Sequence, residues 1–187
     1  MVYTEALGPA AFIGRARVVP LRNTGSALSA QSAFNFLQGL ETLALRMERH
    51  CENTQRVAEY LQQHPAVEWV NYAGLATDKH HALAEKITQG KGSGILSFAV
   101  KGGHQAAVNF IDALQLFLRL VNIGDAKSLA CHPASTTHRQ LSPQELAKAG
   151  VSENLVRLSV GIEHIDDIIA DLEQALQASQ RASLKSA

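Results

Sequence analysis

The sequence has few of the residues that mark several large functional classes. Its 187 residues include only two cysteines, Cys51 and Cys131, which lie far apart and form no Cys-x-x-Cys motif. This usage argues against a disulfide framework and favours free thiols in a reducing cytoplasm. Basic and acidic residues number 17 each, so the net charge is zero. A balanced charge offers no electrostatic footprint for nucleic acid or an anionic membrane, and we predict neither as a partner.

Long apolar runs and targeting signals are lacking as well. No apolar stretch approaches the roughly 20 residues that span a bilayer. The first residues, 1–6, lack the basic and apolar regions of a signal peptide. The eight histidines show no His-x₃-His spacing that would indicate a zinc site. We therefore expect a cytoplasmic protein without a resident metal.

What the sequence does have is a regular alternation of strand and helix patterns. Hydrophobic residues make up 46%, which suits one globular domain with a real core. Apolar periodicity predicts helices over about 41–62, 78–87, 104–114 and 165–178, and strands over 67–72, 94–100, 119–123 and 155–160. Residues 1–25 show no regular pattern, and helical spacing begins after Ser29, which can cap a helix. The fold class predicted is α/β (α+β), with a small antiparallel or mixed sheet and helices packed on one face.

Arg157 is the first candidate for chemistry, because it lies inside the apolar strand pattern 155–160. Strand alternation puts its side chain on the face opposite to that of Leu158. A partly buried arginine is costly without an anionic partner, and its guanidinium fork matches a carboxylate. That partner is either internal, such as Glu163 or Asp125, or a bound carboxylate. The residue pattern alone favours the internal partner.

Two further segments carry polar residues in recognisable order. The first reads Asn122-Ile-Gly-Asp-Ala-Lys-Ser-Leu129, in which the Asn122 amide can donate and accept hydrogen bonds. Taken alone, an asparagine near a glycine is most often a strand end or a turn. The second reads Cys131-His-Pro-Ala-Ser-Thr-Thr-His138. We interpret most of its hydroxyls and imidazoles as hydrogen-bonding a loop into place at the sheet edge.

These two segments, together with Val156-Arg-Leu-Ser-Val-Gly-Ile-Glu163, resemble the C-terminal domain of the Cys/Met-metabolism family of pyridoxal-phosphate (PLP) enzymes of fold type I. Within that family the resemblance is to the O-acetylhomoserine sulfhydrylases. It continues through residues 39–50 and 161–172, so it covers nearly the whole chain. It implies PLP as cofactor, a connecting segment with helical structure over 1–28, and a C-terminal domain over 29–187. The surface that would face the large domain should expose apolar area, so we also predict a homo-oligomer.

The resemblance also implies substrate-binding roles for four residues. Arg157 matches the arginine of an Arg-Leu-Ser-x-Gly motif that holds the α-carboxylate of the amino-acid substrate. Asn122 takes a position beside that carboxylate where many relatives have serine. Thr136 belongs to a stretch that lines the substrate side of the cavity. Arg22 resembles one of a pair placed near the active-site entrance, although a solvated loop charge explains it equally well.

One feature that the family requires has no counterpart in this sequence. The Schiff-base lysine stands in a Ser-x-Thr-Lys context, and none of the seven lysines does. The large PLP-binding domain is therefore expected to be absent, with no PLP bound covalently and no catalytic residue supplied by this chain alone. The expected role is part of a transferase that converts O-acetylhomoserine and sulfide or a thiol to homocysteine or methionine and acetate. The alternatives are part of a methionine or cystathionine γ-lyase or γ-synthase, and a free-standing domain that binds a partner without catalysis.

Overall fold

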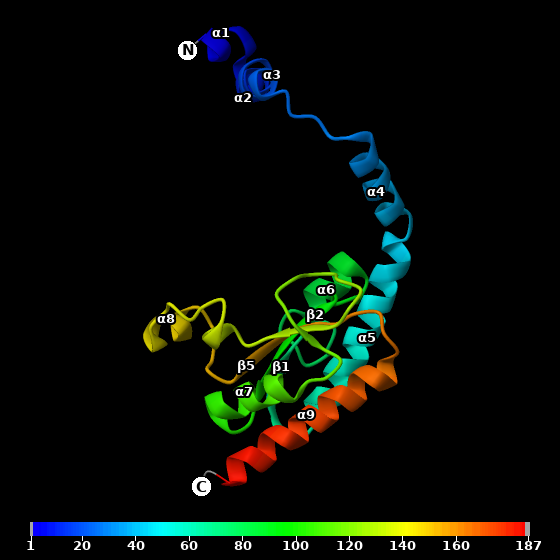
Figure 1. Ribbon diagram of the computed structural model, residues 1–187, viewed down its shortest axis with the longest axis vertical. Helices are drawn as coiled ribbons and strands as arrows, with labels where there is room; N and C mark the ends of the chain where they lie inside the picture. The colour runs from blue at the N-terminus through cyan, green and yellow to red at the C-terminus, as the bar shows by residue number, and fades with distance from the viewer. Residues whose placement is uncertain (1, 186–187) are drawn as a thin grey trace. The chain divides into compact units, whose positions relative to one another are not determined.

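The computed structural model of the chain, shown in Figure 1, describes residues 2–185, and the side chains of 2–181. It divides between Thr42 and Leu43 into two compact units, which we call the N-terminal unit and the C-terminal unit. The domain limits 1–28 and 29–187 stay a prediction, and each unit is described by itself. No helix within residues 2–185 is long and apolar enough to cross a membrane.

The N-terminal unit is helical, as the family resemblance implies for the connecting segment, whereas the irregular structure suggested by the residue pattern of 1–25 alone is wrong. Its elements are α1 (Val2–Leu7), η1 (Gly8–Ala10), α2 (Ala11–Ala16), η2 (Arg17–Leu21), α3 (Arg22–Thr24) and α4 (Ala30–Glu41). Gly25 ends α3 in the left-handed conformation, with φ of +63°. The predicted cap is confirmed, because the Ser29 hydroxyl accepts a hydrogen bond from the Ser32 N–H at 3.1 Å.

The C-terminal unit contains one mixed sheet of five strands in the order β1-β2-β5-β4-β3. The strands are β1 (Val67–Asn71), β2 (Ile95–Val100), β3 (Leu118–Arg119), β4 (Leu129–Cys131) and β5 (Leu155–Ser159). Neighbours pair antiparallel, except that β3 and β4 run parallel. The mixed sheet of the predicted fold class is therefore confirmed.

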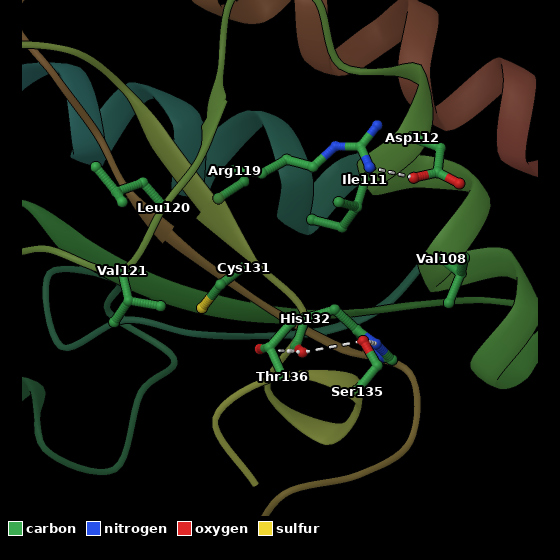
Figure 2. A pocket seen from close by; sticks show the side chains of 11 residues that line it. Val108, Ile111, Asp112, Arg119, Leu120, Val121, Cys131, His132, Ser135 and Thr136 are labelled. Carbon is green, nitrogen blue, oxygen red and sulfur yellow. Dashed lines mark hydrogen bonds and ion pairs between the residues drawn. The ribbon is translucent and has the colours of Figure 1, made fainter. Parts of the chain in front are cut away.

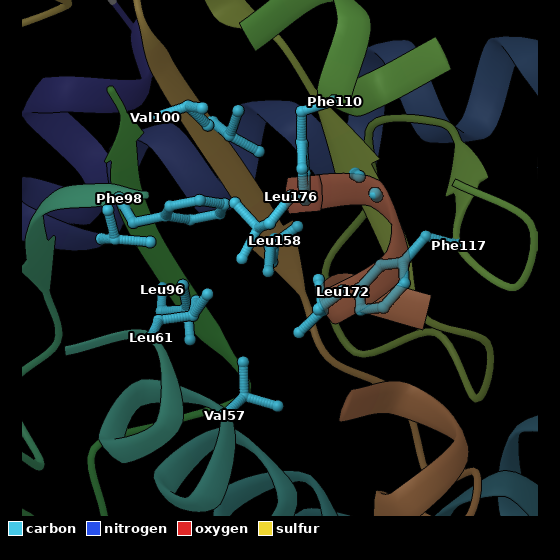
Figure 3. Packing of buried hydrophobic residues seen from close by; sticks show 14 of the residues in the cluster. Val57, Leu61, Leu96, Phe98, Val100, Phe110, Phe117, Leu158, Leu172 and Leu176 are labelled. Atoms are coloured by element: carbon cyan, nitrogen blue, oxygen red, sulfur yellow. The ribbon is translucent and has the colours of Figure 1, made fainter. Parts of the chain in front are cut away.

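Three helices pack on one face of this sheet and enclose the core. They are α5 (Leu43–Gln63), α7 (Gly103–Ala113) and α9 (Ile165–Lys185), and Figure 1 shows α9 running beside α5. Phe98 of β2 meets Phe110 of α7 edge to face, with ring centroids 5.5 Å apart. Figure 3 shows these rings with the aliphatic side chains around them: Val57, Leu61, Leu96, Val100, Leu158, Leu172 and Leu176. Burial of this apolar cluster is the main stabilisation of the unit.

The shorter elements lie in the connections. They are α6 (His81–Thr88), η3 (Pro133–Ser135) and α8 (Pro143–Lys148). The start of α8 is a complete capping box, as its Ser-Pro-Gln-Glu sequence indicates. The Ser142 hydroxyl accepts from the Glu145 N–H, while the Glu145 carboxylate accepts from the Ser142 N–H at 2.8 Å.

Two details of the predicted elements are wrong. The i, i+3, i+4 spacing of apolar residues along α5 predicts that Leu43 and Met47 are buried, but they are exposed, at 41% and 38%. The strand expected over 119–123 ends at Arg119 instead. Its continuation stops because the Asn122 side chain accepts a hydrogen bond from the Ile123 N–H at 2.9 Å, and Gly124 follows with φ of +74°.

Candidate carboxylate-binding site

Arg157 occupies the middle of β5, the third strand across the sheet. Its strand neighbours are Ser97 on β2 and Cys131 on β4. The adjacent residues Val156 and Leu158 are fully buried in the core, so alternation places the Arg157 side chain on the sheet face that the core helices do not cover. The side chain is half-buried there.

The guanidinium of Arg157 has no carboxylate partner within the described residues. Its Nη2 donates a hydrogen bond to the main-chain oxygen of Asn122 at 3.2 Å, and no ion pair within 4 Å involves it. Glu163 is occupied by the N–H and hydroxyl of Ser128, and Asp125 accepts from the Lys127 N–H at 3.1 Å. The internal-partner interpretation is therefore wrong. A half-buried cation without a counter-ion is poised for an external anion.

A cavity of about 460 Å³ lies against Arg157. Its volume suits a small metabolite. His138 also lines it, and the remaining lining residues carry no charge: Asn71, Tyr72, Ala73, Gly92, Ser93, Ile95, Leu96, Ser97, Pro133, Val151 and Leu155. Arg157 is its one side chain of fixed charge, so a bound anion would orient toward that residue.

Asn122 contacts Arg157 through its main chain and not through its side chain. Its carbonyl accepts the Arg157 hydrogen bond, while its side-chain oxygen accepts from the Ile123 N–H and its amide lies 3.5 Å from Asp125. The structure therefore brings Arg157 and Asn122 together. The contribution of the Asn122 side chain is to shape the turn.

Thr136 lines a different cavity, of about 450 Å³, shown in Figure 2. Its hydroxyl donates to the main-chain oxygen of His132 at 2.8 Å, so it is engaged within its own turn. Arg119 and Asp112 form an ion pair of 2.7 Å in the lining of this cavity, which is otherwise largely apolar. Cys131 also lines it and is the strand partner of Arg157.

Arg22 belongs to α3 of the N-terminal unit, where it is exposed. Nothing in the structure relates its position to Arg157, so its role near an entrance stays a prediction.

The Cys131 thiol is a protonated neighbour of Arg157. Its side chain is 7% exposed, and burial raises the pKa of the thiol above its usual range. The nearby Arg157 guanidinium lowers that pKa, but burial has the larger effect. Cys131 therefore does not neutralise Arg157 at physiological pH, and the positive charge remains for a ligand.

His132 anchors the Cys131–His138 segment, as that motif suggested. Its Nε2 donates to the main-chain oxygen of Glu153 at 2.7 Å, and its Nδ1 accepts from the Ser135 hydroxyl at 2.8 Å. Burial lowers the pKa of His132; the Glu153 carbonyl opposes that shift and His104 adds to it. The imidazole is consequently neutral in the folded chain.

This burial predicts a loss of stability in mild acid. Because the folded-state pKa of His132 lies below its unfolded value of about 6.5, the unfolded chain takes up the proton first as pH falls. The stabilisation is fully present above about pH 6.5 and is lost as pH falls toward the folded-state pKa. Urea unfolding at pH 7.5, 6.5 and 5.5 should show a falling free energy of unfolding, and His132→Gln should flatten that slope. An equal slope in both proteins would contradict the assignment to His132.

The described lysines lie away from the two cavities. All six of them, Lys79, Lys86, Lys91, Lys101, Lys127 and Lys148, are exposed, and none lines the two cavities. Lys91 lies 3.5 Å from Glu48, and Lys101 donates to the main-chain oxygen of Pro65 at 2.7 Å. The side chain of Lys185 lies outside the described residues. Across the described part of the chain, no cluster of three His, Cys, Asp or Glu side chains could hold a metal ion.

Comparison with known proteins bears directly on this site. The profile of the Cys/Met metabolism PLP-dependent enzymes matches residues 9–177. The chain belongs to this family. The O-acetyl-L-homoserine sulfhydrylase of Leptospira meyeri is 58% identical over 168 residues, covering 89% of this chain and 38% of that enzyme. The L-methionine gamma-lyase of Pseudomonas putida is 48% identical over 174 residues, covering 92% of this chain and 44% of that enzyme.

A solved structure shares the fold as well. The putative O-acetylhomoserine (thiol)-lyase of Campylobacter jejuni matches with a TM-score of 0.80 and 46% identity over 91% of this chain and 40% of that protein. That structure carries N'-pyridoxyl-lysine-5'-monophosphate. The family resemblance, the fold-type-I architecture and PLP as the family's cofactor are thereby confirmed. The chain spans about two fifths of the length of these relatives.

Proposed function

We propose that this chain supplies the substrate-carboxylate site of a PLP-dependent O-acetyl-L-homoserine sulfhydrylase. That enzyme exchanges the acetate of O-acetyl-L-homoserine for sulfide or a thiol. The observation that carries the proposal is Arg157, a half-buried guanidinium with no internal carboxylate and a cavity of about 460 Å³ against it. The high identity to sulfhydrylases of several organisms supports it.

The residues of this chain bind and orient the substrate. One edge of the Arg157 guanidinium can bind both oxygens of an α-carboxylate, while its Nη2 donates to the Asn122 carbonyl. Fixing the carboxylate fixes the direction of the Cα substituents, which is a positioning contribution to catalysis. PLP, when bound, supplies the electron sink of the reaction. The lysine that holds it is proposed to come from outside residues 1–187, since the described lysines are all exposed.

A γ-lyase of methionine is the second candidate, favoured by the 48% identity to the Pseudomonas putida enzyme. Both reactions begin with an amino acid whose carboxylate Arg157 would bind. Products separate them, because a sulfhydrylase consumes sulfide and releases acetate, whereas a lyase releases ammonia from methionine.

The proposal is tested by asking what the chain does alone. We would incubate it with PLP, reduce with borohydride, measure the intact mass, and assay homocysteine formation from O-acetyl-L-homoserine and sulfide. We expect an unmodified mass and no homocysteine. A stoichiometric adduct with turnover would show that one of the chain's own lysines holds the cofactor, which would contradict the proposed division of the site.

We also propose a homo-oligomer, and the surface of the N-terminal unit supports self-association. Its large apolar side chains are exposed: Phe12 at 83%, Phe34 at 55%, Phe36 at 63%, and Leu37 and Leu40 at 60%. Apolar area of this kind is typical of a protein interface. We expect dimers or larger species in light scattering at micromolar concentration, and Phe12→Ser with Phe36→Ser should lower the measured mass. A monomeric wild-type chain would contradict this prediction.

A further inference from the structure

A buried group of hydrogen bonds joins the Asn122 turn to the end of β5. The Glu163 carboxylate accepts from the Ser128 N–H at 2.7 Å and from the Ser128 hydroxyl at 2.9 Å. The same hydroxyl accepts from the Gly161 N–H at 2.9 Å, and the Ile162 N–H donates to the Ala126 carbonyl at 2.9 Å. Ser128 is fully buried. We call this group the Ser128–Glu163 clasp.

Two side chains of α5 also bind the clasp and the end of β5 next to it. The Asn53 amide donates to the main-chain oxygens of Gly161 and Glu163, both at 3.0 Å, and His50 contacts the Val160 carbonyl at 2.6 Å. Gly161 has no side chain, so its main chain can lie close to the main chain of Ala126 and Ser128. A Cβ there would lie 2.2 Å from the Glu163 carboxylate and 2.6 Å from the Ser128 nitrogen. The clasp is therefore a close-packed joint between α5, the end of β5 and the start of β4.

The turn that precedes the clasp has little else to fix it. Residues 122–127 are exposed or half-exposed, and Ile123 is 71% exposed. The hydrogen bonds of Asn122 and Asp125 within the turn are local. A segment with few buried contacts has low local stability unless its ends are anchored. Its anchor on the C-terminal side is the clasp.

The position of this turn determines where Arg157 points. The hydrogen bond from Arg157 Nη2 to the Asn122 carbonyl joins residues 35 apart in the sequence, and the guanidinium also interacts with the Cys131 thiol. A displaced turn would withdraw that carbonyl and remove one of the two contacts that hold the guanidinium. The main chain of residues 122–128 thus connects Ser128 to Arg157.

We propose that Ser128 and Glu163 are positioning residues for the substrate carboxylate. They place the Asn122 carbonyl and, through it, the Arg157 guanidinium. This inference rests on the proposed function for the role of Arg157 as the carboxylate ligand. Neither Ser128 nor Glu163 touches the bound carboxylate, so their effect is on the orientation of Arg157.

The test follows the Arg157 guanidinium by NMR in the full chain labelled with [¹⁵N]arginine. The Nε–H signal of Arg157 is assigned by its loss in Arg157→Lys, and acetate is the probe. We expect Ser128→Ala to shift this signal without acetate and to weaken acetate binding about tenfold, the size typical of a lost hydrogen-bond network. Glu163→Gln keeps the side-chain length and one acceptor oxygen, so it should show a smaller change of the same sign.

Ser179→Ala is the matched control. Ser179 is also fully buried, and its hydroxyl donates to the Leu176 carbonyl at 2.7 Å within α9. Its loss should lower the melting temperature without moving the Arg157 signal. Unchanged Arg157 signals and acetate affinity in Ser128→Ala and Glu163→Gln would overturn the positioning role. If acetate does not shift the Arg157 signal of the wild-type chain, the proposed function is overturned instead. The spectra of the variants without acetate would then still decide the positioning role.

Discussion

Arg157→Met is expected to abolish binding of a substrate carboxylate while leaving the fold intact. The substitution keeps an unbranched apolar side chain but removes the guanidinium fork. Losing one partner of a charged, bidentate pair costs about 2–5 kcal/mol, which corresponds to a loss of roughly 30-fold or more in affinity. The affinity of Arg157→Lys should fall between those of the wild type and of Arg157→Met, since lysine keeps the charge but not the fork. Isothermal titration with O-acetyl-L-homoserine measures both variants.

The stability of Arg157→Met separates this role from a structural one. Because no described carboxylate pairs with Arg157, its removal breaks no ion pair, and what is lost is the hydrogen bond to the Asn122 carbonyl and the contact with the Cys131 thiol. The free energy of unfolding should therefore change by less than about 1 kcal/mol. A large destabilisation with unchanged ligand binding would mean that Arg157 is a structural cation.

Asp171→Ala is expected to have the largest effect on stability. The Asp171 carboxylate is 6% exposed and accepts from the N–H groups of Gln115 and Leu116 at 2.9 Å and of Phe117 at 3.1 Å. It thereby holds the turn between α7 and β3 against α9, with the Phe117 ring in the core (Figure 3). Alanine leaves these buried donors unpaired, and a cost of about 3–5 kcal/mol follows.

The control for this prediction is Asp167→Ala on the same helix. Asp167 is exposed in the first turn of α9, where its charge interacts only with the helix dipole. Its removal should cost less than about 1 kcal/mol. Urea unfolding of both variants measures the difference, and similar free energies for the two would show that the Asp171 hydrogen bonds contribute little.

Much of the fold follows from local patterns in the sequence. The strand of Arg157 alternates between the core and the opposite face, and the capping box at Ser142 forms as its residues predict. Arg157 could be singled out because an arginine in an apolar strand needs a partner. These inferences succeed because each rests on neighbours within a few residues.

The remaining features depend on contacts between distant residues. Glu163 accepts hydrogen bonds from Ser128 rather than from Arg157. Ser128 and Glu163 lie 35 residues apart, and sequence spacing gives no sign of their contact. Thr136 has the right chemistry for a ligand but its hydroxyl is engaged by the His132 carbonyl, which only the folded turn shows. Met47 follows the spacing of a buried stripe, yet the core does not extend to that turn of α5.

The most direct measurement is the response of the Arg157 Nε–H signal to O-acetyl-L-homoserine and to its methyl ester. The two ligands differ in the carboxylate alone. If Arg157 binds that carboxylate, the acid should shift the signal in a saturable way and the ester should leave it unchanged. Equal responses to the acid and the ester, or no response to the acid, would contradict the assignment of Arg157 as the substrate-carboxylate ligand.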